Sequence, residues 1–447
     1  MISRSIEKDI TEWINKGKNA LLISGARQVG KTYTIRECLK RSGKDHLEVN
    51  LIDNPGYTDI FRTASNISDI AMELGFATGH RFIPGETILF IDEIQEYGDI
   101  ITRIKFWVDD GSYRFILSGS LLGIELTDLR SAPVGYMDEI QMYPMDFIEF
   151  LTATGTEPEV IEHLRSHYYN KEPLSETLHT AMMERFVRYL VTGGMPAAVN
   201  SFVNDGDLNE VFSIQKNIIS LYKRDFTKYE AKEKKLMLQS IYDLIPTQLL
   251  KQNRRFNLAD IKKGMKYERL EDSFLWLKAA GVAICVFNST EPRLSLKQNE
   301  KSSLVKLYLS DVGLLTCMYG KSTKLGLLTG TGINMGGIYE NAVVMELKRH
   351  GYDLYYYNSR KLGELDIVIE HKGHILPIEV KSGKDYYVHS AVNNVLSVDE
   401  FSIGEAVVFS NYNIRTEGKV TYYPVYMSTF LYDDTVLPII KTHALKT

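Results

Sequence analysis

A loop closed by two glycines constrains this chain more than any other feature. It reads Gly25, Ala26, Arg27, Gln28, Val29, Gly30, Lys31 and Thr32. The glycines permit backbone angles that a side chain would forbid, so successive N–H groups can turn inward on phosphate oxygens. The spacing G-x-x-x-x-G-K-T, after an apolar run, predicts a phosphate-binding loop between a buried strand and a helix. The alternative, a glycine-rich turn, does not account for the strand and helix patterns on either side.

The residue types at the end of this loop have a chemical reason. A helix beginning near Lys31 adds the positive end of its dipole to the phosphate site. Lys31 would reach the β- and γ-phosphates of ATP, and the Thr32 hydroxyl would hold Mg²⁺. All eight residues of the loop are therefore candidate nucleotide-binding residues, and ATP and Mg²⁺ are the expected cofactors.

Length and composition limit the remaining choices. A chain of 447 residues is too long for one core, so roughly two to four domains are expected. No apolar stretch approaches the ~20 residues that cross a bilayer, and the N-terminus lacks a signal-peptide pattern, which predicts a cytoplasmic protein without a membrane segment. The three cysteines are scattered and do not indicate structural zinc. With a net charge of −5, a DNA partner would need a local basic patch.

Two further buried strands are predicted to end in polar side chains. One apolar run ends in Asp92 and Glu93. Asp92 would lie beside the Mg²⁺, and Glu93 would polarise the attacking water as a general base. The other strand, residues 114–118, ends at Ser118, and either this serine or Ser120 could sense the γ-phosphate. Alternating strands and helices predict a parallel sheet with its ligand at the C-terminal ends of the strands.

These segments resemble the prokaryotic AAA-type ATPases that carry a P-loop. The matching stretches are residues 25–32, 89–95, 116–120, 143–150 (Tyr-Pro-Met-Asp-Phe-Ile-Glu-Phe), 193–196 (Gly-Gly-Met-Pro), 222–225 (Tyr-Lys-Arg-Asp) and 307–315. The Ala-Gly-Arg of that family is not matched, because Pro133–Tyr136 stands in its place, which leaves any role of that arginine open; Arg130 lies nearby and could substitute for it. The resemblance spans most of the chain and implies ATP binding and hydrolysis.

Residues 231–330 have the outline of a winged helix, with three helical segments followed by two strands. The helices are expected at 236–250, near 257 and at 268–280, and the strands at 282–287 and 304–309. The stretch from 251 to 269 holds seven basic residues against two acidic ones, a local charge of +5. The basic residues are Lys251, Arg254, Arg255, Lys262, Lys263, Lys266 and Arg269. Such a patch could bind a DNA backbone; the alternatives are a solvated helical face or a lid on the ATPase.

A second group of chemically suited residues lies near the C-terminus. Asp366 falls on one predicted strand, and Glu379 and Lys381 alternate on the next. Carboxylate oxygens suit Mg²⁺, and the lysine could steady a hydroxide or a phosphate. Glu340, on a preceding helix, could add a third carboxylate. This constellation resembles the PD-(D/E)xK nuclease core, which implies Asp366, Glu379 and Lys381 as catalytic residues and Glu340, Asp366 and Glu379 as metal ligands.

The predicted fold class is α/β with four domains. They are a P-loop AAA-type parallel-sheet ATPase domain at 1–150, a helical connector at 151–230, a winged-helix-like domain at 231–330 and a PD-(D/E)xK nuclease-like domain at 331–447. One functional hypothesis is an ATP-driven enzyme that binds DNA and cleaves it with a metal. The other is a nucleotide-dependent switch or scaffold whose C-terminal domain binds a partner without cleaving. The sequence leaves the oligomeric state open, with a homo-oligomer as one outcome.

Overall fold

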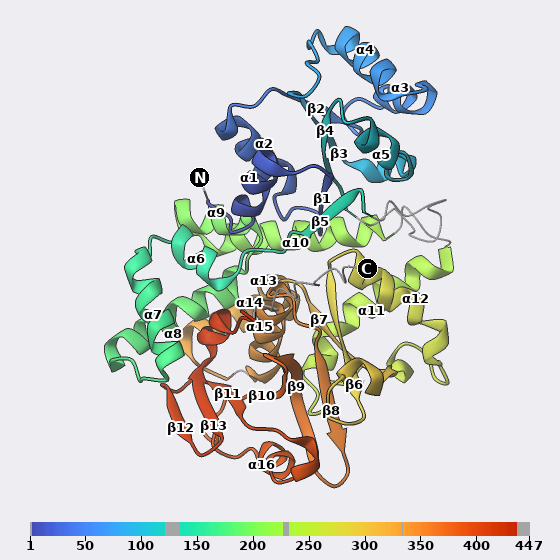
Figure 1. The fold of residues 1–447 in the computed structure, drawn as a ribbon. Coiled ribbons are helices and arrows are strands. Elements are labelled where there is room, and N and C mark those ends of the chain that lie inside the picture. The colour runs from blue at the N-terminus through green and yellow to red at the C-terminus, as the bar shows by residue number, and fades with distance from the viewer. Residues whose placement is uncertain (1, 121–134, 227–231, 333, 436–447) are drawn as a thin grey trace, which may run out of the picture. The chain divides into compact units, whose positions relative to one another are not determined.

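The computed structural model describes residues 2–120, 135–226, 232–332 and 334–435 (Figure 1). The chain divides into two compact units. The first comprises Met1–Ile161, Glu184–Cys285 and Lys306–Ala342, and the second comprises Glu162–Met183, Val286–Val305 and Val343–Thr447. Residues 162–183 and 286–305 therefore group with the C-terminal residues and not with the segments around them.

The first unit contains a five-stranded sheet in which all strands are parallel. Its order is β2-β3-β4-β1-β5. The strands are β1 Ala20–Ser24, β2 His46–Asn50, β3 Ile88–Asp92, β4 Arg114–Ser118 and β5 Met137–Gln141. Every residue of β1 and β3 is buried, as the apolar runs predicted. The predicted parallel sheet is confirmed, but the sequence pattern did not predict β5, because this edge strand is largely polar and its residues are not fully buried.

Helices cover both faces of this sheet, with α1 and α2 on one side and α5 on the other (Figure 1). They are α1 Glu7–Lys16, α2 Lys31–Ser42, α3 Tyr57–Thr63, α4 Ile67–Thr78 and α5 Asp99–Asp110, with a 3-10 turn η1 at Ile94–Tyr97. The core on one face joins Leu22, Ile91 and Leu117 of the strands to Ile70 and Trp107 of the helices. Burial of these apolar side chains holds the strand ends, and hence the loops that follow them, in place.

Helices dominate the middle of the chain. They are α6 Phe147–Ala153, α7 Pro158–Asn170, α8 Glu176–Thr192, α9 Pro196–Asp205, α10 Leu208–Asp225, α11 Lys232–Leu249, α12 Glu271–Ala279, α13 Val312–Tyr319, α14 Lys321–Thr329 and α15 Gly336–Arg349, with 3-10 turns η3 Leu258–Asp260 and η4 Tyr267–Arg269. Within the described ranges, none of the helices combines the length and apolar character needed to cross a membrane.

Three of the segments that carry the family resemblance meet in the first unit. Gly194 donates its N–H to Asp311 Oδ2 at 2.6 Å, and its carbonyl oxygen accepts from the Met145 N–H at 2.7 Å. A Cβ on Gly194 would lie 2.0 Å from the Met145 carbonyl oxygen, so only glycine fits there. The Gly-Gly-Met-Pro turn is therefore a packing junction between the segment after β5 and the start of α13.

The remaining strands form one mixed sheet of eight, in the order β12-β13-β11-β10-β9-β8-β6-β7. The strands are β6 Ala283–Ser289, β7 Glu300–Leu309, β8 Tyr355–Ser359, β9 Gly363–His371, β10 His374–Val380, β11 Ala406–Ser410, β12 Arg415–Glu417 and β13 Val420–Pro424; the short helices are η5 Leu296–Asn299, α16 Ser390–Leu396, η6 Asp399–Phe401 and η7 Val425–Phe430. The hairpin predicted for the C-terminal strands is confirmed, since β9 and β10 pair antiparallel.

The predicted wing needs correction. Its two strands exist as β6 and β7, but β6 also pairs in parallel with β8, with Phe287 opposite Tyr355. In the strand order β6 lies between β8 and β7, and all seven of its residues are buried. The two strands therefore form the edge of the eight-stranded sheet and do not stand alone as a two-stranded wing.

Candidate functional site

The phosphate-binding loop runs from β1 to α2 in the conformation that its sequence demands. Gly25 has φ 140° and Gly30, just before α2, has φ 96°. A Cβ on Gly25 would lie 2.2 Å from the carbonyl oxygen of Met142, so the close approach of the segment after β5 also requires glycine. The loop is closed by Lys31, whose Nζ donates to the carbonyl oxygens of Gly25 and Ala26, each at 2.9 Å.

Asp92 lies at the centre of a polar cluster formed by four elements. Its Oδ2 accepts from the Thr32 hydroxyl at 2.9 Å and from Asn50 Nδ2 at 3.0 Å, and its Oδ1 accepts from the Ser118 hydroxyl. Asp92 follows Ile91 at the end of β3, and pairs in register with Asn50 of β2 and Ser118 of β4. The parallel register of three strands thus delivers these side chains to one edge of the sheet, beside the first turn of α2.

Burial changes the proton affinity of the two charged groups here. Burial raises the pKa of the Asp92 carboxyl, although the hydrogen bonds from Ser118 and Thr32 lower it in part. Burial lowers the pKa of Lys31 to about 8, against the opposing attraction of Glu93 and Asp92. The Asp92 side chain has only neutral hydrogen-bond donors among the described residues, and the nearby Lys31 ammonium attracts it without forming an ion pair there. A carboxylate and a hydroxyl in this setting fit a divalent cation.

Glu93, the predicted general base, follows Asp92 with a left-handed backbone, φ 60°. Its carboxylate accepts from Gln95 Nε2. Gln95 in turn crowds Gly119, because a Cβ there would lie 2.6 Å from Gln95 Oε1. Ser120 is buried, and its hydroxyl has no partner among the described residues, whereas the Ser118 hydroxyl contacts Asp92. The structure therefore brings Ser118 to the cluster and leaves Ser120 outside it.

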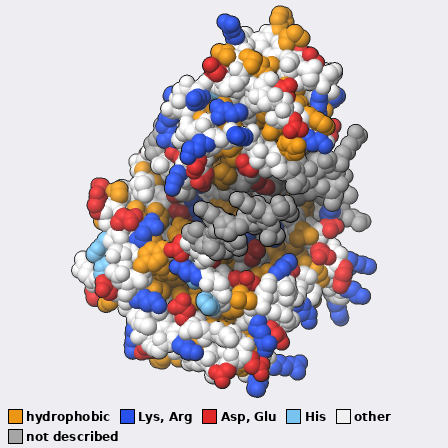
Figure 2. Space-filling model, viewed as in Figure 1, with side chains coloured by type: hydrophobic (Ala, Val, Ile, Leu, Met, Phe, Trp, Pro, Cys, Tyr) orange, Lys and Arg blue, Asp and Glu red, His pale blue; other side chains and the backbone are white. Residues whose placement is uncertain are grey.

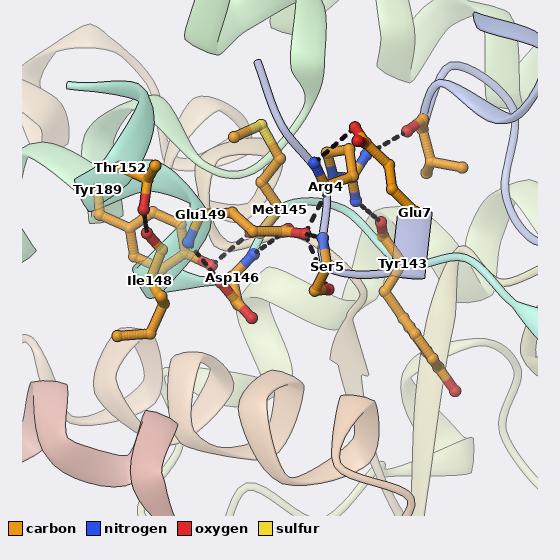
Figure 3. A network of polar contacts seen from close by, with 11 residues as sticks. Arg4, Ser5, Glu7, Tyr143, Met145, Asp146, Ile148, Glu149, Thr152 and Tyr189 are labelled. Atoms are coloured by element: carbon orange, nitrogen blue, oxygen red, sulfur yellow. Dashed lines mark hydrogen bonds and ion pairs between the residues drawn. The ribbon is translucent and has the colours of Figure 1, made fainter. Parts of the chain in front are cut away.

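Arg4, which the sequence analysis did not single out, supports the loop from the N-terminal side. Its Nη1 donates to the Val29 carbonyl oxygen at 2.8 Å and its Nη2 to that of Tyr143 at 2.7 Å, while its Nε lies 3.2 Å from Glu149 Oε1 (Figure 3). Glu149 also accepts from the Ser5 N–H at 2.7 Å. Arg4 therefore links the phosphate loop, at Val29, to residues 143–150, at Tyr143 and Glu149.

A pocket of about 370 Å³ opens beside the loop. Its walls come from the N-terminal segment, the loop, α2 and α9, and they include Ile2, Gly30, Tyr33, Met145 and Pro196. The lining is mainly apolar, and Gly30 connects it to the start of α2. A pocket of this kind suits a flat apolar group attached to phosphates.

Asp366, Glu379 and Lys381 lie together in the second unit. The β9–β10 register pairs Ile367 with Ile378, so the next pair places Asp366 opposite Glu379. Asp366 Oδ2 accepts from the Val380 N–H at 3.0 Å, and Lys381 Nζ lies 2.7 Å from Glu379 Oε1. The structure thus brings Asp366 and Glu379 to neighbouring positions at this end of the hairpin, and the Lys381 side chain, one residue after β10, pairs with Glu379.

Glu340, the expected third carboxylate, has a different environment. It is 0 % exposed, and it forms ion pairs with Arg254 and with Lys306, the latter at 3.5 Å. The Tyr308 hydroxyl also donates to Glu340 Oε1. Two cations already compensate this carboxylate, which does not suit a metal ligand. Within the ranges that the structure describes, no group of three or more His, Cys, Asp or Glu side chains is placed to hold a metal.

The basic stretch between α11 and α12 is only partly available to a partner. Arg254 turns inward to Glu340, and Lys251 pairs with Asp260. The other five cations are exposed and form no ion pair or side-chain hydrogen bond in the described part of the chain: Arg255, Lys262, Lys263, Lys266 and Arg269. Figure 2 shows lysine and arginine side chains gathered over this part of the surface. Arg130 lies outside the described residues.

The fold and the site of the first unit define a P-loop domain of the ATPase type. Residues 17–151 match the family described as AAA domain. Residues 183–325 match a domain of unknown function (DUF8612), and residues 335–427 match another (DUF4143). Neither of these two descriptions assigns an activity, so the nuclease-like nature of residues 331–447 stays a prediction.

Two solved structures show partial similarity to this chain. The Walker-type ATPase PABY2304 of Pyrococcus abyssi is 15% identical over 71% of this chain and 96% of that chain, with a TM-score of 0.41. The Aeropyrum pernix ORC1 protein, solved in complex with DNA, is 14% identical over 73% of this chain and 95% of that chain, with a TM-score of 0.29. At these values the similarities carry no information on function. A sequence search of curated proteins gives no match.

Proposed function

We propose that this chain binds ATP with Mg²⁺ at the phosphate loop and hydrolyses it. The observation that carries the proposal is the cluster around Asp92, where a buried carboxylate with only neutral donors faces the Thr32 hydroxyl at 2.9 Å. Thr32 and Asp92 would hold the cation, which when bound neutralises charge on the phosphates. Lys31 would leave the carbonyl oxygens of Gly25 and Ala26 and bind phosphate oxygens instead.

The other residues of the site have separate roles in this proposal. Glu93, on the residue after Asp92, would orient and deprotonate the attacking water. Ser118 would keep Asp92 oriented and transmit the state of the γ-phosphate to β4. The base would occupy the 370 Å³ pocket beside Gly30, between Tyr33 and Pro196. The backbone N–H groups of residues 25–32 would surround the phosphates.

Replacement of Lys31 tests this proposal. Lys31→Ala should lower the rate of ATP hydrolysis about a hundredfold or more, because it removes the cation that stabilises the developing charge on the phosphates. Lys40→Ala, an exposed lysine on the same helix, is the matched control and should retain activity. Hydrolysis and nucleotide binding that are equal in the two variants would refute the assignment.

A second proposal is that the basic stretch between α11 and α12 binds the DNA backbone. Its support is the five exposed cations, for which the described residues provide no ion-pair or side-chain hydrogen-bond partner. The triple variant K262E/K263E/K266E should weaken DNA binding and flatten its dependence on salt, because each phosphate contact adds about one unit to the salt slope. The control K18E/K40E/K44E makes the same charge change elsewhere in the first unit. Equal loss in both variants would mean that net charge, and not this stretch, controls binding.

A third proposal is that Asp366, Glu379 and Lys381 in the second unit carry out metal-dependent DNA cleavage. Asp366 and Glu379 would hold a divalent cation, and Lys381 would stabilise charge on the phosphate. Supercoiled, linear and branched DNA should be cleaved with Mg²⁺ or Mn²⁺, and D366A or K381A should abolish cleavage. The exposed pair Lys384 and Asp385 in the following loop provides the control K384A/D385A. Absence of cleavage together with intact ATP hydrolysis would favour the alternative, a nucleotide-dependent switch or scaffold.

A further inference from the structure

The C-terminal end of helix α10 contacts the phosphate loop at Arg27. Asp225 Oδ1 lies 3.1 Å from Arg27 Nη1, and the Tyr222 hydroxyl donates to the Arg27 carbonyl oxygen at 3.0 Å. Tyr222 and Asp225 are three residues apart, which places them on one face of the helix. The helix therefore holds Arg27 by its side chain and by its backbone at the same time.

Asp225 forms the ion pair that compensates the Arg27 charge among the described residues. The Arg27 side chain is 21% exposed and that of Asp225 is 4% exposed. The Nε and Nη2 atoms of Arg27 are buried and have no hydrogen-bond partner in the ranges described. A largely buried charge that loses its partner is strongly destabilised where it lies. Loss of Asp225 would therefore drive the Arg27 side chain out of its present position.

Movement of Arg27 would disturb the phosphate site directly. The next residue, Gln28, has φ 68°, an uncommon value for a residue other than glycine. The backbone N–H groups of this stretch are those that a loop of this class directs at phosphates. The turn after α12 packs on the same stretch, since a Cβ on Gly281 would lie 3.0 Å from the Ala26 nitrogen.

We propose that Asp225 is a positioning residue for the nucleotide. Through Arg27, Asp225 holds the phosphate loop in the conformation that binds phosphates. Nucleotide affinity therefore depends on the position of the C-terminal end of α10 relative to the loop. Lys223, two residues before Asp225, forms an ion pair with Asp243 of α11 at 2.5 Å. The end of α10 therefore contacts both the phosphate loop and the next helix. The inference rests on the proposed binding of ATP at the loop.

Nucleotide titration of full-length variants tests the inference. D225N should raise the Kd for ATP and for ADP about tenfold, within the usual range of coupling between sites. The KM for ATP should rise in parallel, while kcat at saturating ATP should stay within about twofold, because Lys31, Thr32 and Asp92 are untouched. The charge-swapped variant R27D/D225R should recover most of the affinity that D225R alone loses.

The control removes the other ion pair of the same helical turn. D243N breaks the pair with Lys223 without touching the loop and should leave the Kd for ATP unchanged. A wild-type Kd in D225N, or a loss in D243N as large as in D225N, would overturn the inference. If D225N unfolds, the swapped variant decides, and failure to recover affinity counts against the proposal. A wild-type chain that does not bind ATP would refute the proposed function itself.

Discussion

Two buried carboxylates in the first unit, Asp92 and Glu340, have opposite surroundings. Asp92 is 1% exposed and accepts hydrogen bonds from two hydroxyls and one amide. Glu340 is 0% exposed and is paired with one guanidinium and one ammonium, with a phenol as third partner. Both were candidate metal ligands by sequence, but in the described part of the chain only Glu340 forms ion pairs, whereas Asp92 has neutral hydrogen-bond donors alone.

The difference shows how a structural carboxylate can be told from one that fits a cation. Neutral donors orient Asp92 without cancelling its charge, so burial raises its pKa and the site favours a positive partner. Arg254 and Lys306 cancel the charge of Glu340, and a third cation would have to displace one of them. The first arrangement suits binding and release, and the second suits permanent packing.

The largest expected effect is on hydrolysis in Asp92→Asn. The amide keeps the shape but removes the charge that would hold the cation, so ATP hydrolysis should fall about 10²- to 10³-fold. The free energy of unfolding should not fall, because burial raises the pKa of Asp92 despite the hydrogen bonds from Ser118 and Thr32, so the ionised carboxylate disfavours the folded state. Hydrolysis rates and urea unfolding of the same preparation measure both quantities. A stability loss without a rate loss would make Asp92 the structural carboxylate of the two.

Glu340→Gln should give the reverse result. The variant removes the buried negative charge that pairs with Arg254 and Lys306, which should lower the free energy of unfolding by about 3 kcal/mol. Hydrolysis per folded molecule should be unchanged at a temperature where the variant is folded. Urea unfolding provides the measurement, and Glu12→Gln, which removes an exposed pair with Lys16, provides the control without a measurable change. A large loss of ATP hydrolysis in the folded Glu340→Gln variant would show that Glu340 has a functional role and is not only structural.

The sequence predicted one of these environments and not the other for a physical reason. Asp92 ends an apolar strand of a repeating strand–helix pattern, and parallel strands bring such ends to one edge of the sheet. The partners of Glu340 come from a loop and a strand far along the chain, and no local periodicity indicates that they meet. Arg4 was missed for the same reason, since its acceptors lie 25 and 139 residues away.

The same limit applies to the strands. Continuous apolar runs predicted β1, β3 and β4, because a strand covered on both faces leaves such a run in the sequence. The polar edge strand β5 leaves no such signal. The strands β6 and β7 were found, but their place at the edge of an eight-stranded sheet depends on pairing with β8, more than sixty residues further on. Elements with local patterns are therefore predictable, whereas non-local pairing is not.

A smaller effect is expected in the pH dependence of ATP affinity at the phosphate loop. Burial lowers the pKa of Lys31 to about 8, and bound phosphates would raise it again. Binding above pH 8 therefore takes up a proton, so ATP affinity should be constant below pH 8 and fall by up to about tenfold per unit above it. Nucleotide titrations between pH 6.5 and pH 9.5 give the profile, with Lys31→Ala as the variant that should lose the decline. A decline that persists in Lys31→Ala would assign it to another group.

The smallest effect concerns the neutral donors themselves. Ser118→Ala removes one hydroxyl that stabilises the ionised form of Asp92, so the pKa of Asp92 should rise further. Hydrolysis should then fall only about fivefold near neutral pH, since one hydrogen bond to a charged group is lost while Thr32 and Asn50 remain. The acid side of the pH–rate profile should move to higher pH, a shift that a mere packing defect would not cause. Ser120→Ala, two residues further on and outside the cluster, should leave the pH–rate profile unchanged. If both variants shift the profile equally, the neutral donors around Asp92 do not control the pKa of its carboxyl group. The contrast between Asp92 and Glu340 would then rest only on the ion pairs that Glu340 forms and Asp92 does not.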